Sequence, residues 1–185
     1  MDNGASSYRR YIDGDDNGIA EIVAAYKDGL ILYLNGYVEN IHTAEELTED
    51  TFFRLVAKKP WFSGRCSFKT WLYTIGRNVA LDHLRRHPKG NEISLEDLEN
   101  YLAEEADLER FYLREERNRT VHRAMRKLNP DYRQVLHLVY FEGFSNGEAA
   151  VILRKSERQI RNLLYRARQS LKAMLEKEGF VYEEL

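Results

Sequence analysis

Cysteine is nearly absent from this chain, since Cys66 stands alone among 185 residues. One cysteine excludes an intramolecular disulfide and any zinc site built from several cysteines. Long apolar runs are missing too, because the longest, Gly29 to Leu34, is far shorter than the ~20 residues that cross a bilayer. The N-terminus is acidic and polar, unlike a secretory signal. We therefore expect a cytoplasmic protein with no membrane insertion of its own.

The sequence shows no sustained strand alternation, no internal repeat and no low-complexity tract. Apolar residues recur instead at helical spacing, and hydrophobic residues make up 43% of the chain, which is enough to fill real cores. We therefore expect an all-α fold.

Recognisable catalytic patterns are also missing. There is no glycine-rich loop that would cradle a phosphate, and no arrangement of a nucleophile with a base is recognisable. We therefore expect that the protein is not an enzyme and binds no cofactor. His83 and His87 have a spacing that can hold a metal and lie near Asp82, but no third ligand with motif character accompanies them. We expect no metal site.

Charge is segregated along the chain, although the net charge is only −2. Residues 1–57 have 4 Lys and Arg against 11 Asp and Glu, and residues 58–90 have 8 against 1. Residues 91–116 have 2 against 10, and residues 117–177 have 14 against 5. Binding to a polyanion depends on the local field, so two basic blocks predict two modules that contact nucleic acid.

This pattern predicts two small helical domains, 1–90 and 117–185, joined by an acidic linker over 91–116. In the first domain the pattern is helical from Tyr8 to Leu55, and Thr43 with Glu46 predicts a capping box. A long helix is predicted from about Phe68 to Arg86, with one side buried. That side comprises Phe68, Trp71, Leu72, Ile75 and Val79.

The second domain contains two closely spaced helix starts. Ser145 with Glu148, and Ser156 with Gln159, are two predicted capping boxes that leave room for only a short turn. Before them, Asn129-Pro130 is predicted to begin a helix that ends at Gly143. The inner face of that helix is predicted to hold Val135, Leu136, Val139 and Tyr140.

The helix after Ser156 has a face that suits the major groove of DNA. Ile160, Leu163, Leu164, Ala167 and Leu171 form an apolar stripe, and Arg158, Arg161, Asn162, Tyr165 and Arg166 point elsewhere. An amphipathic helical hairpin with a solvated basic face is the alternative on this segment alone.

Aromatic and basic residues alternate from Trp61 to Arg77, a combination that suits single-stranded nucleic acid. Arg65 and Lys69 are the stronger candidates for contact, because Phe68 and Trp71 also fit a core position.

The helix that follows Thr43 has an acidic face of Glu45, Glu46, Glu49 and Asp50. That face would repel phosphate and suits a protein partner, although a solvated acidic first turn explains Glu45 and Glu46 equally well.

These segments together resemble one family, from about Tyr8 to Leu175. The matching segments are TAEELTEDTFFRL, FSGRCSFKTWLYTIGRNVALDHLRR, LNPDYRQVLHLVYFEGFSNGEAAVIL and RQIRNLLYRARQSL, in that order. The chain resembles a group IV, extracytoplasmic-function (ECF) sigma factor of the sigma-70 family.

The resemblance implies a promoter-specificity subunit of bacterial RNA polymerase. A region 2-like domain would dock on the clamp helices of the core enzyme and melt the minus-ten element, and a region 4-like helix-turn-helix would bind the minus-thirty-five element. An anti-sigma factor is a further partner that the resemblance implies.

The resemblance also implies site residues, by motif position. Polymerase binding maps to Glu45, Glu46, Leu47, Asp50 and Phe53. Melting of the downstream element maps to Phe62, Arg65, Phe68, Lys69, Arg77, Asn78 and Asp82, and upstream recognition maps to Arg158, Arg161, Asn162, Tyr165 and Arg166.

Some positions depart from the family pattern. Arg154-Lys155 stand where the turn usually has a glycine, so either one non-glycine residue has a positive φ there or the turn itself differs. Leu163 replaces a position that is often basic, and Asn162 one that is often serine. A dimeric helix-turn-helix regulator is the alternative function, but it leaves the aromatic-basic loop and the acidic helix unexplained.

Overall fold

The computed structural model describes residues 3–87 and 116–177, and every regular element in these ranges is helical. The expected all-α fold is therefore confirmed for the described residues. The chain divides into two compact units, Met1–Glu105 and Ala106–Leu185. The division falls within the predicted linker over 91–116, which lies outside the described residues except for Glu116, so the linker stays a prediction.

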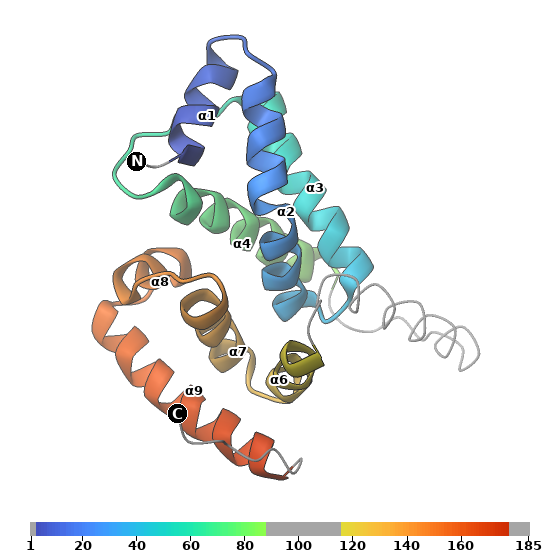
Figure 1. The fold of residues 1–185 in the computed structure, drawn as a ribbon, viewed down its shortest axis with the longest axis vertical. Coiled ribbons are helices and arrows are strands. Elements are labelled where there is room, and N and C mark those ends of the chain that lie inside the picture. Colours follow the sequence, from blue (N-terminus) through green and yellow to red (C-terminus); the bar gives the residue numbers. More distant parts are fainter. Residues whose placement is uncertain (1–2, 88–115, 178–185) are drawn as a thin grey trace, which may run out of the picture. The chain divides into compact units, whose positions relative to one another are not determined.

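Unit 1 contains α1 (Asn3–Ile12), α2 (Asn17–Val38), α3 (Ile41–Lys58) and α4 (Phe68–Arg86). Helix α2 contacts the other three, and Figure 1 shows it between α1 and α3 with α4 running across it. The core lies where these helices meet, and its fully buried members include Ile22, Leu30, Ile31, Leu34, Ile41, Leu55, Phe68 and Leu72. Removing this apolar surface from water is the main favourable term for the unit.

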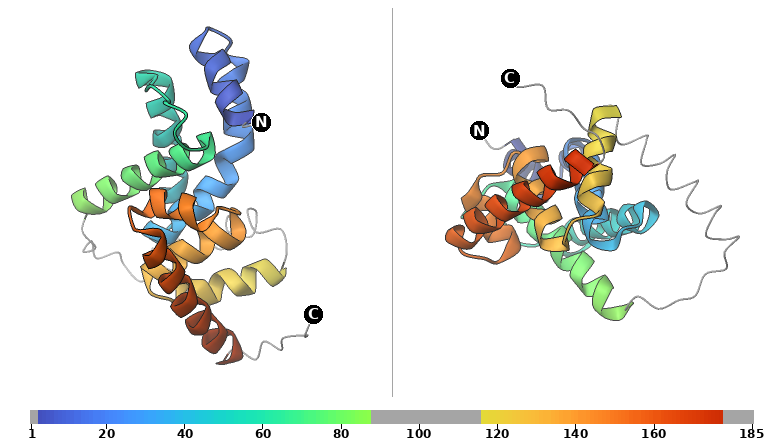
Figure 2. Two further views of the ribbon diagram at one scale, coloured as in Figure 1. Left: turned by 90° about the vertical axis from the view of Figure 1, so that its left-hand side faces the viewer. Right: turned by 90° about the horizontal axis from the view of Figure 1, so that it is seen from below.

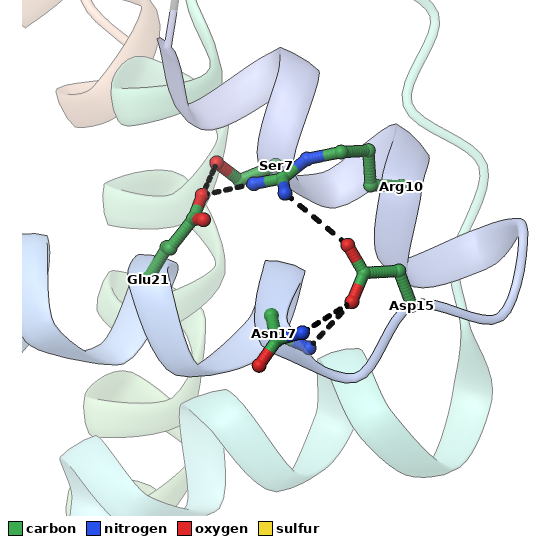
Figure 3. A network of polar contacts seen from close by, with 5 residues as sticks. All are labelled: Ser7, Arg10, Asp15, Asn17 and Glu21. Carbon is green, nitrogen blue, oxygen red and sulfur yellow. Dashed lines mark hydrogen bonds and ion pairs between the residues drawn. The ribbon is translucent and has the colours of Figure 1, made fainter.

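The helical pattern predicted over Tyr8 to Leu55 corresponds to three helices, which are separated by two turns. Gly14 has φ +105 between α1 and α2, and Glu39 has φ +57 between α2 and α3. A polar network closes the first turn, where Arg10 pairs with Glu21 and with Asp15 (Figure 3). Hydrogen bonds from Arg10 and Ser7 hold the pKa of the Glu21 carboxyl below its usual value. Because these charges are exposed, the network orients the corner and adds little stability.

The predicted capping box at Thr43 and Glu46 is wrong. Helix α3 begins two residues earlier, at Ile41, and its cap is Asn40, whose side chain accepts a hydrogen bond from the Thr43 amide at 2.8 Å. Asn40 has the extended backbone that a cap requires, whereas Thr43 is already inside the helix. The start of α4 agrees with the prediction, because Ser67 caps it and Phe68 is its first residue.

Unit 2 contains α6 (Glu116–Arg126), α7 (Pro130–Leu136), the π-helical turn η1 (His137–Phe141), α8 (Asn146–Leu153) and α9 (Glu157–Lys177). Figure 2 shows α9 as the long red helix, and α6, α7 and α8 all contact it. The core of this unit includes Met125, Val135, Leu136, Leu138, Ile152, Ile160 and Ala167.

The helix predicted to continue from Pro130 to Gly143 changes its hydrogen bonding on the way. After Leu136 it widens into η1, where the Glu142 amide donates to the His137 carbonyl five residues before it. This wider turn shifts the buried face. Leu138 is buried and Tyr140 is exposed, so the prediction that Tyr140 lies on the inner face is wrong.

Gly18 is the point of closest approach between α1 and α2. A Cβ atom on Gly18 would lie 2.2 Å from the Ser7 carbonyl oxygen and 2.9 Å from the Tyr11 amide nitrogen. Both are backbone atoms, so no change of rotamer can relieve the contact.

We expect Gly18→Ala to lower the free energy of unfolding of unit 1 by about 1–3 kcal/mol, because the added methyl group must push α1 and α2 apart. Urea unfolding followed by circular dichroism measures the change. Gly147→Ala is the control, because the nearest atom to its added Cβ, Ser145 Oγ, is 4.0 Å away. Equal midpoints for the two variants would contradict the close packing of α1 on α2.

Candidate nucleic-acid and protein interfaces

Two capped helices and one strained residue form the helix-turn-helix of unit 2. At α8 the Ser145 Oγ accepts from the Glu148 amide at 3.2 Å, and the Glu148 carboxylate accepts from the Ser145 amide at 3.0 Å. At α9 the same pair of bonds joins Ser156 and Gln159, at 3.2 and 2.7 Å. Both predicted capping boxes are confirmed.

The turn between these helices contains Arg154 at φ +53, in the left-handed region. Of the two expected alternatives, the structure has the non-glycine residue at positive φ. For a residue with a side chain, the left-handed backbone conformation is roughly 1–2 kcal/mol less stable than the right-handed one. The packing of α8 against α9 must offset this cost.

Helix α9 has one buried side and one exposed side. Ile160, Leu164, Ala167 and Leu175 are buried, whereas Leu163 and Leu171, predicted in the same stripe, are half-buried. All five residues predicted to contact upstream DNA are exposed: Arg158, Arg161, Asn162, Tyr165 and Arg166. Arg161 pairs with Glu157 at 3.3 Å, one turn earlier on the same helix.

The segment from Lys59 to Ser67 joins α3 to α4 in unit 1 and is irregular. Its predicted contact residue Arg65 is exposed, and Phe62 is half-buried. Phe62 packs against Phe68 and Trp71, with ring centroids 5.7 and 5.1 Å apart. The aromatic side chains therefore hold the loop, and the basic side chain at its tip is free to meet a ligand.

Phe68 is the predicted contact residue that the fold places differently, because its side chain is 0% exposed. It lies among the rings of Tyr8, Tyr26, Phe62 and Trp71. We therefore assign Phe68 to the support of the loop rather than to contact with a base. Trp71, for which a core position was the favoured alternative, is half-buried in the same cluster.

The remaining downstream candidates lie along α4. Lys69 Nζ is 5.6 Å from the centre of the Tyr73 ring. Asp82 pairs with Arg85 and, at 3.9 Å, with Arg54 of α3, and the hydrogen bond from Arg85 is the main reason why the pKa of Asp82 is lowered. Arg77 and Asn78 are half-buried.

The acidic face of α3 also divides into exposed and supporting residues. Glu46 and Asp50 are exposed, and so is Phe53, at 66%. Leu47 is buried and Glu45 is half-buried. An apolar ring beside carboxylates is the chemistry of a protein interface rather than of a DNA contact.

Tyr8 is a residue of this site that sequence reasoning missed. Its hydroxyl donates to the Pro60 carbonyl at 2.8 Å, and its ring centroid lies 5.4 Å from those of both Phe68 and Trp71. Burial raises the pKa of Tyr8 to about 12, so the hydroxyl remains a donor at any physiological pH. The tyrosines at positions 8 and 11, three residues apart on one helix face, were the available signal.

No group of three His, Cys, Asp or Glu within residues 3–87 and 116–177 is placed to hold a metal ion. The tilted rings of His83 and His87 lie with their centroids 4.5 Å apart, and burial, followed by the field of His87, lowers the pKa of His83. None of the described helices combines the length and the apolar character needed to span a bilayer.

The fold and these surfaces define an all-helical, DNA-binding protein with a helix-turn-helix in its second unit. Residues 22–89 match the model for sigma-70 region 2, and residues 118–171 match the model for sigma-70 region 4.

Similar proteins are known in several bacteria. The ECF RNA polymerase sigma factor SigM of Bacillus subtilis is 31% identical over 156 residues, which cover 84% of this chain and 94% of SigM. The RNA polymerase sigma-H factor of Pseudomonas aeruginosa is 29% identical over 171 residues, covering 88% and 89%.

Solved structures of low sequence identity have the same fold. CnrH, solved with the cytosolic domain of CnrY, has a TM-score of 0.66 at 23% identity and covers 95% of this chain and 96% of its own. RpoE of Bartonella quintana, solved with the anti-sigma factor NepR, has a TM-score of 0.62 at 20% identity, with 85% and 96% covered.

The chain belongs to the extracytoplasmic-function type of the sigma-70 family. It is therefore a promoter-specificity subunit that directs bacterial RNA polymerase to promoters and assists strand opening. The comparisons lend no support to a stand-alone dimeric regulator.

Two buried histidines pack α6 against η1. The His122 ring lies 4.5 Å from that of Phe141 and 5.9 Å from that of His137, between centroids. Burial, followed by the field of His137, lowers the pKa of His122 from 6.5 to about 3. Folded His122 is therefore neutral at pH values where the unfolded chain binds a proton.

We expect neutral His122 to leave the free energy of unfolding of unit 2 unchanged above pH 6.5. Below that value, down to about pH 3, the free energy of unfolding should fall as the pH drops. Since protons then favour the unfolded chain, the slope approaches about 1.4 kcal/mol per pH unit for this one group. Urea unfolding between pH 7 and 4.5 measures it. His122→Phe should remove most of the slope, and an unchanged slope in that variant would contradict the assignment.

Proposed function

We propose that the two units divide promoter recognition and that each named surface has one task. Arg158, Arg161, Asn162, Tyr165 and Arg166 of α9 read the upstream element, and the loop and α4 residues Phe62, Arg65, Lys69, Arg77, Asn78 and Asp82 act on the melted downstream element. Glu45, Glu46, Asp50 and Phe53 of α3 dock on the clamp helices of the polymerase. Phe68 and Leu47 support these surfaces from the core.

The division of α9 into a buried stripe and an exposed basic face is the observation that carries this proposal. An α-helix fits the major groove, where Arg and Asn side chains can pair with base edges. Phosphate contacts add an attraction that does not depend on sequence. The aromatic cluster adds support for strand opening, because stacking on a base is worth ~1–3 kcal/mol and unstacking one costs a few kcal/mol.

The proposed mechanism uses binding energy and no chemical step of its own, so the protein acts in the cytoplasm as a non-enzymatic subunit. Polymerase would hold both units on one promoter, so that two weak contacts become one strong one. We also propose an anti-sigma partner that covers the polymerase-binding surface. The solved complex of RpoE with NepR supports that partner by analogy.

Transcription reconstituted with core polymerase on a library of genomic fragments tests the proposed function. We expect initiation at start sites that share upstream and downstream elements. Initiation without sequence preference would overturn the proposal, and so would binding of the free protein to duplex DNA as a two-fold dimer.

We expect Arg161→Ala to weaken binding of the holoenzyme to the upstream element by about 1–3 kcal/mol, the value of a bidentate contact with a base. Footprinting of the upstream element measures the loss. Glu157→Gln is the control, because it removes the partner of Arg161 and one negative charge and should leave binding equal or stronger. Equal footprints for Arg161→Ala and the wild type would refute this role.

We expect Asp50→Arg to reduce association with core polymerase at least tenfold, because the change reverses the charge in the middle of the acidic face. Competition for core polymerase against a labelled sigma factor measures the association. Asp13→Arg makes the same charge change at an exposed position in the turn before α2 and should have no such effect. If both variants compete equally well, the α3 face is not the surface that binds polymerase.

A further inference from the structure

A pocket of about 190 Å³ lies between α1 and the segment that joins α3 to α4. One wall is made by Ala5, Tyr8 and Ile12 of α1, and the other by Pro60 and Phe62. Neither family resemblance nor motif spacing pointed to α1 as part of a binding site. Typical small-molecule sites measure ~300–1,000 Å³, so this pocket has room for one planar ring and not for a whole cofactor.

The pocket is held open by contacts on both sides of it. The hydrogen bond from Tyr8 to the Pro60 carbonyl, at 2.8 Å, and a weaker one from the Tyr11 hydroxyl to the Val56 carbonyl, at 3.4 Å, fix α1 to the other wall. Lys59 has φ +40, a left-handed conformation that turns the chain towards α1 at the end of α3. Lys59 is the C-cap of α3, and its amide donates to the Leu55 carbonyl at 3.1 Å.

The remaining lining residues supply charge and an exposed ring. Trp61 is 87% exposed, the most exposed of the large apolar side chains in the described ranges. Arg9 and Lys59 add two cations, and Lys59 Nζ lies 4.8 Å from the centre of the Tyr11 ring. The Arg9 side chain is exposed and makes no ion pair or hydrogen bond with the other described residues, so its charge is available.

An apolar slot, an exposed indole and two cations fit a flat ring that carries an anionic group. A nucleotide of single-stranded DNA has this chemistry, because its base can stack on an aromatic ring while its phosphate meets a cation. An apolar side chain of a protein would use the slot and the indole but would gain nothing from Arg9 and Lys59. The charges therefore favour a nucleotide.

We propose that this pocket binds one nucleotide of the melted promoter strand, next to the part of the strand on which the loop and α4 act. Phe62 belongs both to the pocket and to the aromatic cluster that holds the loop, so one strand can reach both places. This inference rests on the proposed function, since it extends the downstream site to α1. The ring stacks on Trp61, and Arg9 and Lys59 neutralise the phosphate.

Trp61→Ala tests the stacking contact in the reconstituted holoenzyme. The probe is a promoter with a pre-melted bubble, compared with the same promoter as an intact duplex. Loss of one stacked base predicts that affinity for the bubble falls roughly 5- to 150-fold, while the upstream footprint is unchanged. The ring is exposed, so the substitution should not disturb the fold.

Abasic substitution, one position at a time along the single strand, identifies the stacked base. We expect one position, distinct from the one that the loop variant Arg65→Ala affects, where base removal weakens binding of the wild type but not of Trp61→Ala. Arg9→Ala should lower the salt dependence of binding by about one phosphate contact. Lys58→Ala, a neighbouring exposed cation outside the pocket lining, is the control and should leave the slope unchanged.

The outcomes separate this inference from the function on which it rests. If the wild-type holoenzyme does not prefer the bubble, the proposed function fails and the pocket assignment fails with it. If the wild type prefers the bubble but Trp61→Ala binds it equally well, or loses the same affinity at every abasic position, only the pocket assignment is overturned. Weaker association of Trp61→Ala with core polymerase, with normal bubble binding, would instead show that the pocket receives a protein side chain.

Discussion

Each helix that presents functional side chains must first bury a stripe of its own surface, and this constraint governs both units. Short helices are marginal in water and depend on such packing. In α9, Ile160, Leu164 and Ala167 are buried one turn apart, so only the remaining face can offer arginines to DNA. In α3, burial of Leu47 and Leu55 leaves Asp50 and Phe53 outside. The packing that stabilises each helix therefore also decides which residues a partner can reach.

The loop of unit 1 has no such regular stripe, and its position depends on an aromatic cluster instead. Tyr8 connects α1 to both ends of this region, because its hydroxyl reaches Pro60 while its ring packs on Phe68 and Trp71. Rings are rigid and large, so a few of them hold an irregular segment at a modest cost in conformational entropy. A loop that is ordered before it meets a strand avoids paying that entropy on binding. Helix α1 is in this sense part of the downstream site.

Electrostatics assigns partners to these surfaces. A net charge of −2 does not describe a protein whose α3 face is acidic and whose α9 face is basic, because each partner responds to the local field. The pair between Arg161 and Glu157 is exposed and weak, so the guanidinium can leave Glu157 at little cost in free energy. Whereas these exposed side chains carry their charge, His122 is buried in unit 2, and its burial favours the neutral form.

Local patterns in the sequence determined the all-α fold, the bounds of α4 and the caps of α8 and α9. These features depend on residues within about four positions of one another, so they can be read without knowing the rest of the fold. The acidic and basic faces followed from the same periodicity. Only the tertiary structure decided that Phe68 and Leu47 are buried, that Tyr140 faces outward after a π-helical turn, and that Tyr8 and Trp61 share a pocket. Burial and enclosure arise from contacts between residues far apart in the chain, and no local pattern specifies those contacts.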